Sequence, residues 1–213
     1  MIGEKPMGLG FDRSILMAAS GVGLASLAYS GGATADEAGQ IAAVREATAK
    51  YQDVAVALAE GFVPAPSGCV TAAEEGLPAD WGAMGIHYIH PAMLKLTKTE
   101  PRVDGMSTHT DFLKPSILLY EPQADGSLVL LGVENLVFQK AWQEAGNSKP
   151  PVFAGRTWDA MADDPATLAD EAHEFEPHFD QHIWTLRENP NGALVPFNPN
   201  VTCEHFKGET HHQ

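Results

Sequence analysis

Two apolar runs joined by a tight turn place the strongest constraint on the fold of this chain. Residues 116–120 and 127–133 are rich in Leu, Ile and Val, and they flank a turn that contains Asp125-Gly126. This pattern is typical of a β-hairpin. The second run is apolar at nearly every position, so we expect a central strand that is covered on both faces. The sequence therefore predicts a sheet built around this hairpin.

Glu134 follows the second apolar run directly and is itself followed by the apolar residues 136–138. A carboxylate in such a run is costly to bury unless it is paired or bound to a cation. One interpretation is a structural ion pair, because an arginine can neutralise a buried carboxylate; the candidates are Arg102, Arg156 and Arg187. The other interpretation is that Glu134 is a ligand in a binding site.

Residues 178–184 combine polar, ligand-capable side chains with aromatic ones. In an extended strand, His178, Asp180, His182 and Trp184 would share one face. A helix would also bring the two histidines together, since they are four residues apart. The β-branched and aromatic residues at the end of the stretch favour a strand, and the Asn-Pro-Asn-Gly sequence after it predicts a turn.

Residues 84–91 form another β-like run, with histidines at positions 87 and 90. Side chains alternate along a strand, so two histidines that are three residues apart face opposite sides. We therefore expect only one of them to reach the core.

Together these strands supply histidines and a carboxylate from separate parts of the chain. The candidate ligands for a divalent transition metal (Zn, Cu, Fe or Mn) are His87, Glu134 and His182, with His178 as a further ligand and His90 as an alternate. Two histidines and one carboxylate leave coordination positions open for water, dioxygen or a substrate. Asp180 would orient a ligand or serve as a catalytic base. A histidine that is buried for packing alone is the alternative for His182.

Charge and motif content exclude several classes of protein. The formal net charge is −15 at pH 7, which argues against a nucleic-acid partner and against anionic membrane surfaces. The chain contains no Gly-x-Ser-x-Gly or His-Glu-x-x-His sequence, no phosphate loop and no dinucleotide fingerprint. A small-molecule ligand is the partner that remains.

Residues 1–35 have the pattern of an export signal. Lys5 and Arg13 precede an apolar run of small residues over 15–29, and Ala33-x-Ala35 fits a cleavage site. The run is interrupted by Ser and Gly and is short for a membrane span, so a retained transmembrane helix is the weaker alternative. We predict a periplasmic or extracellular protein without stable membrane association after cleavage.

Export determines how the two cysteines, Cys69 and Cys203, are interpreted. In an oxidising compartment an even pair is most simply one disulfide. Two buried free thiols are the alternative. Metal ligation by the cysteines lacks the Cys-x-x-Cys spacing of a zinc site.

The remaining segments complete an α+β prediction for a single domain over residues 36–203. Apolar positions at spacings of three, four and seven predict one amphipathic helix over 36–62. We expect it to pack on a mainly antiparallel curved sheet or partial barrel. The other expected segments are a turn-rich linker at 64–68, a short helix at 138–146, a return strand at 193–197 and a loose tail at 204–213. The acidic residues between Asp159 and Asp180 are expected to lie in a solvated loop or short helix; a calcium site is the alternative, but the segment lacks EF-hand spacing.

Several short sequences carry a resemblance. They are Gly-Ile-His-Tyr at 85–88, Leu-Tyr-Glu-Pro at 119–122, Gly-Val-Glu at 132–134, His-Ile-Trp at 182–184 and Asn-Pro-Asn-Val-x-Cys at 198–203. In this combination the chain resembles a group of small exported bacterial proteins over residues 51–203. The resemblance implies an exported single domain, and it carries no activity over to this chain.

These observations give three hypotheses for function. The first is an exported metal-binding protein, with enzymatic action on a small molecule at the two-His, one-carboxylate site. The second is a non-catalytic protein that binds a small ligand in a cavity. The third is a structural envelope protein in which the same groups form a polar core.

Overall fold

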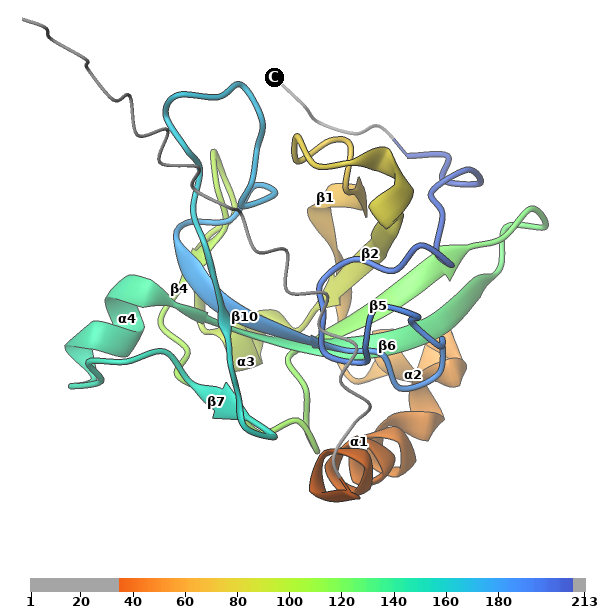
Figure 1. Ribbon diagram of the computed structural model, residues 1–213, viewed down its shortest axis with the longest axis horizontal. Coiled ribbons are helices and arrows are strands. Elements are labelled where there is room, and N and C mark those ends of the chain that lie inside the picture. Colours follow the sequence, from red (N-terminus) through yellow and green to blue (C-terminus); the bar gives the residue numbers. More distant parts are fainter. Residues whose placement is uncertain (1–34, 209–213) are drawn as a thin grey trace, which may run out of the picture.

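A six-stranded antiparallel sheet, curled into a half-barrel, forms the centre of the molecule (Figure 1). The computed structural model describes residues 35–208. In sheet order the strands are β1 (Val63–Thr71), β2 (Ala83–Ile89), β5 (Ile117–Pro122), β6 (Leu128–Phe138), β10 (His178–Ile183) and β9 (Asp159–Met161). The α+β fold with a curved antiparallel sheet is therefore confirmed.

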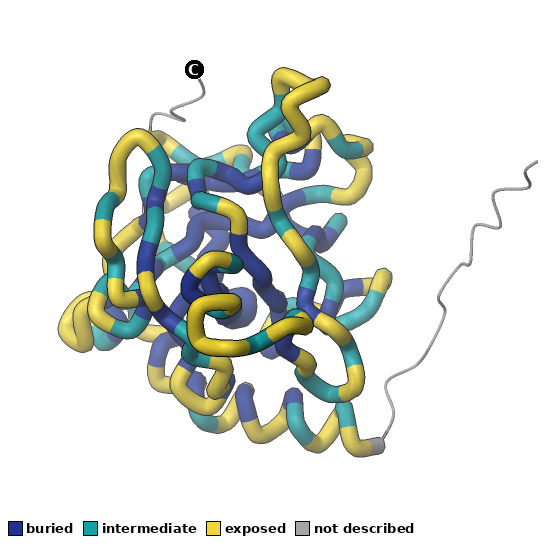
Figure 2. Tube along the Cα trace, turned by 90° about the vertical axis from the view of Figure 1, so that its left-hand side faces the viewer, coloured by how far each residue is buried: buried dark blue, intermediate teal, exposed yellow. Residues whose placement is uncertain are grey.

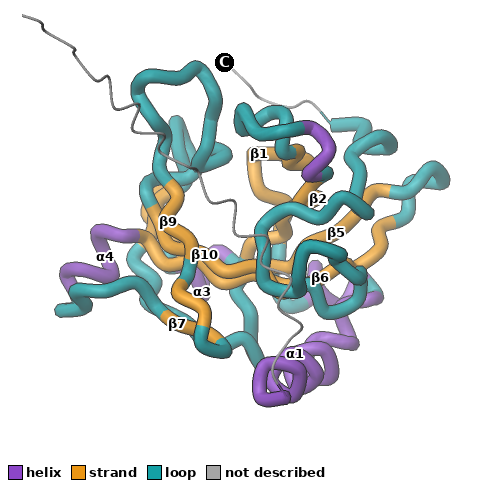
Figure 3. The backbone as a smooth tube through the Cα atoms, in the orientation of Figure 1, coloured by secondary structure: helices purple, strands orange, loops and turns teal. Residues whose placement is uncertain are grey.

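Shorter elements and loops surround the sheet (Figure 3). They are α3 (Pro91–Leu94), α4 (Gln139–Glu144), the 3₁₀ turn η2 (Ala79–Trp81) and two small ribbons, formed by β3 (Leu96–Lys98) with β4 (Asp104–Gly105) and by β7 (Val152–Phe153) with β8 (Arg156–Thr157). The predicted helix at 138–146 corresponds to α4.

The predicted hairpin is confirmed as β5 and β6. Its turn is closed by the Asp125 side chain, which accepts a hydrogen bond from the Ser127 backbone N–H. Strand β6 lies between β5 and β10 and is buried from Leu130 to Phe138. As expected for the central strand, it places the residues that follow Gly132 deep inside the molecule.

The N-terminal helical region packs on one face of the sheet (Figure 1). One continuous helix over 36–62 was the wrong prediction: the region divides into α1 (Ala35–Thr48), the 3₁₀ turn η1 (Ala49–Gln52) and α2 (Val54–Ala59). The cause is Asp53, whose carboxylate caps α2 by accepting a hydrogen bond from the Ala55 N–H. The Tyr120 hydroxyl of β5 donates to the Tyr51 carbonyl and ties this region to the sheet.

Two other sequence predictions are wrong. Residues 64–68 are part of β1, not a linker; β1 is an edge strand with β2 as its one neighbour in the sheet, and an edge strand tolerates prolines such as Pro64 and Pro66. The register shift between Pro64 and Cys69 accommodates them. Residues 193–197 form a loop, not a return strand, because its carbonyl groups are bound by the side chains of Gln181 and Trp184.

The predicted disulfide is confirmed between Cys69 of β1 and Cys203. The two residues are 134 positions apart in the sequence, and a loop of that length gives about 4 to 5 kcal/mol of stabilisation in the chain-entropy model. Buried segments lie inside a rim of exposed loops (Figure 2). In the described part of the chain, no helix combines the length and the apolar character needed to cross a membrane. The predicted export signal lies outside the described residues except for Ala35, and residues 209–213 of the predicted tail also lie outside them.

Candidate metal centre

The face of the sheet opposite α1 and α2 carries the predicted ligands. Glu134 of β6 pairs in register with His182 of β10, and His87 comes from β2, two strands away. Two strand spacings correspond to about 10 Å, so β2 and β6 can meet through side chains only because the sheet curls towards this face. The structure therefore brings together residues that are distant in the sequence.

The contacts in this first group are short and fully enclosed. Glu134 Oε2 lies 3.1 Å from His87 Nε2 and 3.3 Å from His182 Nε2. All three residues are fully buried, and one ligand atom of each lies within 4.8 Å of the others. Backbone space here is equally tight: a Cβ atom at Gly85, which has a φ of +92°, would lie 2.6 Å from the Tyr120 carbonyl oxygen. His87 is thus held by a strand that approaches its neighbour closely.

A structural ion pair between Glu134 and an arginine is the wrong interpretation. Each of the three candidate arginines has another carboxylate as its partner: Arg102 binds Asp163 and Asp170, Arg156 binds Asp159, and Arg187 binds Glu121. Glu134 has only imidazole groups as its ion-pair partners among the described residues.

A second group lies beside the first and consists of His173, His178 and Asp180. All three are fully or almost fully buried, and one ligand atom of each again lies within 4.8 Å of the others. Asp180 Oδ2 is 3.8 Å from His178 Nε2 and 3.8 Å from His182 Nδ1. The predicted alternation along residues 178–184 is therefore confirmed, since His178, Asp180 and His182 face one side.

His173 was missed by the sequence analysis, which assigned its segment to a solvated acidic loop. It is 3% exposed, and it has a φ of +37°, followed by +69° at Glu174. Such left-handed conformations are unfavourable for non-glycine residues and persist only where the surroundings impose them. Arg102 supplies part of that constraint, because its guanidinium donates twice to the Phe175 carbonyl. No periodicity in the sequence indicates this inward turn.

His90, the alternate ligand, lies apart from both groups. Its ring accepts a hydrogen bond from the Met93 N–H and caps α3, and it contacts Phe62 edge to face. The prediction that only one histidine of the 84–91 run reaches the core is confirmed, and that histidine is His87.

Buried polar atoms without a hydrogen bond are concentrated in this region of the described chain. Such atoms are a few per hundred residues in folded proteins, and each calls for an explanation. Here they include both ring nitrogens of His87, His173 and His182, both carboxylate oxygens of Glu134 and Asp180, His178 Nε2 and Glu75 Oε1. Lone pairs of imidazole and carboxylate that converge in this way form a donor set suited to a transition-metal cation.

The pKa values in the first group favour neutral histidines. Burial lowers the pKa of His87 well below its usual value, and burial likewise lowers that of His182. Burial raises the pKa of Glu134 to about 7, against the opposing effect of His182. Neutral imidazoles are the form that binds metals, so the two histidines are ready for coordination at neutral pH.

The second group has a different balance of charge. Burial lowers the pKa of His173, but the neighbouring Glu75 carboxylate raises it, with a net result of about 9. Burial raises the pKa of Asp180, but His178 and His182 bring it below its usual value. The metal-free second group therefore holds a carboxylate and a cationic imidazole.

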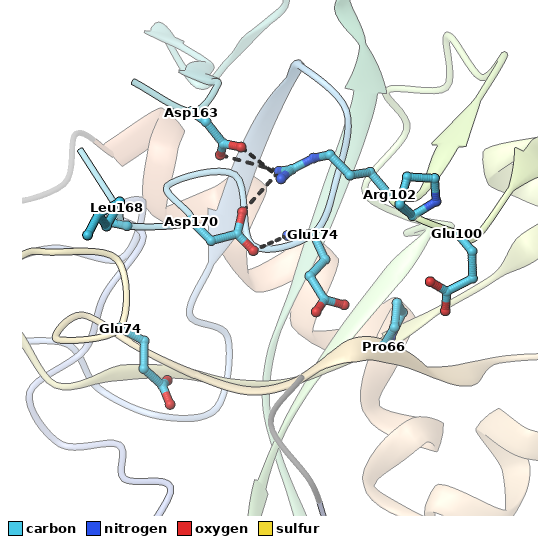
Figure 4. Close-up of a pocket in the computed structure, with 10 residues that line it drawn as sticks. Pro66, Glu74, Glu100, Arg102, Asp163, Leu168, Asp170 and Glu174 are labelled. Carbon is cyan, nitrogen blue, oxygen red and sulfur yellow. Dashed lines mark hydrogen bonds and ion pairs between the residues drawn. The ribbon is translucent and has the colours of Figure 1, made fainter. Parts of the chain in front are cut away.

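Two surface cavities lie near this centre. One, of about 600 Å³, has Glu75 on its wall together with apolar residues that include Trp81 and Phe197. Glu75 also forms an ion pair with His173 at 3.2 Å, so this cavity adjoins the buried cluster. The other, of about 670 Å³, surrounds Arg102 and is lined by carboxylates, two of which bind that arginine (Figure 4).

Comparison of the chain with protein-family models, curated protein sequences and solved structures gives no match.

Proposed function

We propose that this is an exported protein that binds a divalent transition metal through His87, Glu134 and His182. The observation that carries the proposal is that Glu134 is fully buried with imidazole groups as its ion-pair partners, while the metal-binding atoms of all three side chains lack hydrogen bonds. A buried carboxylate is tolerated when it is paired or coordinates a metal. The disulfide between Cys69 and Cys203 is the feature that supports an oxidising compartment.

The proposed activity is metal-assisted chemistry on a small molecule. His87, Glu134 and His182 would hold a metal such as Zn²⁺ or Fe²⁺ with coordination positions left open, where the metal would supply activation of water, dioxygen or a substrate oxygen. Asp180 lies 3.8 Å from His182 Nδ1, beyond hydrogen-bond distance; in this proposal a shorter approach would let it orient that ring and accept a proton. The cavity beside Glu75 is the route by which a small molecule would approach.

Metal analysis of the exported chain tests the proposal. The protein would be purified without an affinity tag, loaded with Zn²⁺, freed of excess metal and analysed by mass spectrometry of elements. Relative to the wild type, we expect His87→Ala, Glu134→Ala and His182→Ala each to lose about one ion per chain. His90→Ala is the matched control, because it removes a histidine that caps α3 outside the cluster. Undiminished metal in all three variants, or no metal in the wild type after reconstitution, would contradict the proposal.

A second candidate function, metal-independent binding of a small apolar ligand, is favoured by the cavity of about 600 Å³ lined by Leu77, Trp81 and Phe197. Trp81 is 46% exposed there, which makes its fluorescence a direct reporter. Ligand-dependent quenching that persists in chelator and is lost in Trp81→Ala would support this function. Quenching that occurs only when metal is present would instead indicate that the ligand in this cavity depends on the metal centre.

A further inference from the structure

We infer that His173, His178 and Asp180 form a second metal site, so that the cluster is a dinuclear centre. The inference rests on the proposed function, because it adds a second ion beside the first. The three side chains are at most 3% exposed, and they place one ligand atom each within 4.8 Å of the others. A mixed set of two imidazoles and one carboxylate is again the donor set of a transition metal such as zinc.

Each histidine of the second site has an acceptor close to one ring nitrogen. His178 Nδ1 lies 2.9 Å from the Glu176 carbonyl, and His173 Nδ1 lies 3.2 Å from Glu75 Oε1. Metal-binding histidines commonly donate one N–H to a carbonyl or a carboxylate, which fixes the ring and leaves the other nitrogen for the metal. In both residues Nε2 is buried and has no hydrogen bond; His173 Nδ1 faces Glu75 as an ion-pair partner but likewise has no hydrogen bond.

The two sites share one enclosed space. The His182 ring approaches Glu134 of the first site with Nε2, at 3.3 Å, and Asp180 of the second site with Nδ1, at 3.8 Å. The rings of His87 and His173 stack with their centroids 5.2 Å apart. The His182 ring therefore lies between the two sites.

The cluster holds enough carboxylates to accommodate two cations. Glu75, Glu134 and Asp180 are all buried, and each contacts at least one histidine of the two groups. Groups of like charge in a low-dielectric interior repel strongly, and several kcal/mol per ion are lost on desolvation. With all three carboxylates ionised, one divalent ion leaves a net charge of −1 and two leave +1, so the carboxylates can accommodate either one ion or two.

The position of Glu75 makes the second site the outer one. This residue contacts His173 and also lines the cavity of about 600 Å³, although no ligand of either site lines that cavity. A small molecule in the cavity would therefore approach the cluster from the side of the second site. Of the two carboxylates in the wall, Asp159 is paired with Arg156 and Glu75 with His173, and the rest of the lining is mainly apolar, so the cavity suits a neutral molecule.

Zn²⁺ stoichiometry tests this inference separately from the proposed function. The wild type is expected to hold two ions per chain, and His173→Ala and His178→Ala are expected to hold one. The same loss from His87→Ala shows that the remaining ion in each variant occupies the other site. His90→Ala keeps both ions. Gln variants at positions 173 and 178 keep a hydrogen-bonding side chain of similar size, and they provide the measurement if the Ala variants do not fold.

The possible outcomes separate the two proposals. One ion in the wild type that is lost in His87→Ala and kept in His178→Gln overturns the dinuclear centre and leaves the proposed function standing. One ion that is lost in His178→Gln and kept in His87→Ala overturns the proposed first site. Absence of Zn²⁺ from the wild type overturns both. Loading with Co²⁺ adds a spectroscopic check, since two occupied sites give two components in a titration followed by visible absorption.

Discussion

Carboxylates gather in two regions of this molecule, and only one of them has the properties of a metal site. Around Arg102, Asp163 and Asp170 lie at the surface with side chains 39% and 26% exposed, and each is paired with the guanidinium (Figure 4). On the inner face of the sheet, Glu134 and Asp180 are fully buried, and within residues 35–208 their ion-pair partners are all imidazoles. Acidic residues are denser in the first region, but the second lacks a permanent cation.

The two regions differ in the exposure of their carboxylates to solvent. An exposed ion pair contributes between 0 and about 1 kcal/mol, because water already solvates both partners. A buried carboxylate without a cation costs several kcal/mol, and a metal ion can offset that cost. Substitutions and metal removal should therefore have large effects in the buried cluster and small effects around Arg102.

The largest expected effect is that of metal removal. If free Zn²⁺ exceeds the dissociation constant by about 1,000-fold, binding to the folded state alone stabilises it by about 4 kcal/mol. We expect denaturant unfolding of the wild type to show a difference of at least this size between Zn²⁺ buffer and chelator, and Glu134→Ala, which loses the ion of the first site, to show a smaller difference. Equal stability of the wild type in both buffers would remove the distinction between the two regions.

The second prediction concerns Glu134→Gln in the metal-free protein. The pKa of Glu134 is raised from 4.5 to about 7 by burial, so the folded wild type holds this proton while the unfolded chain releases it. The free energy of unfolding of the wild type, relative to that of the variant, should therefore fall as the pH rises from about 4.5 to about 7, and it should stay low above pH 7. The shift corresponds to about 3 kcal/mol.

The measurement for Glu134→Gln is denaturant unfolding of both proteins in chelator at several pH values. A variant that is less stable than the wild type by several kcal/mol above pH 7 would show that Glu134 is a structural ion-pair partner instead. Addition of Zn²⁺ should reverse the order of stability, because the Gln side chain does not replace the carboxylate ligand.

The third prediction links the two regions through Arg102. This guanidinium binds Asp163, Asp170 and the Phe175 carbonyl, and so holds the segment that carries His173. We expect Arg102→Met to lower the free energy of unfolding by about 1 kcal/mol, because its side chain is partly exposed. The variant should lose Zn²⁺ from the second site before the first. Full retention of two ions would show that the segment does not depend on Arg102.

Sequence reasoning reached the parts of the centre that lie on regular strands. Alternation placed His178, Asp180 and His182 on one face, and the apolar surroundings of Glu134 marked its burial. His87 was separated from His90 by the same period of two. These predictions succeeded because strand geometry converts spacing in the sequence directly into direction in space.

The parts that were missed depend on tertiary structure. His173 turns inward through two consecutive left-handed residues, and nothing local in the sequence requires that conformation. Pro64 and Pro66 indicated a linker, but the edge of a sheet tolerates them. Asp53 divided the N-terminal helix through a cap that the continuous apolar spacing concealed. The sequence alone could not show whether Glu134 is paired with an arginine, because the carboxylate partner of each arginine is set by the tertiary structure.

The smallest effect is expected for Asp163→Asn at the surface. Asp163 pairs with Arg102 and accepts a hydrogen bond from the Ala172 N–H, which an asparagine carbonyl can also accept. Arg102 keeps Asp170 as its partner in the variant. We therefore expect a loss of about 0.5 kcal/mol in denaturant unfolding and unchanged Zn²⁺ stoichiometry. A loss of either ion in this variant would mean that the surface carboxylates affect metal binding at the buried centre. The two regions would then not be energetically independent.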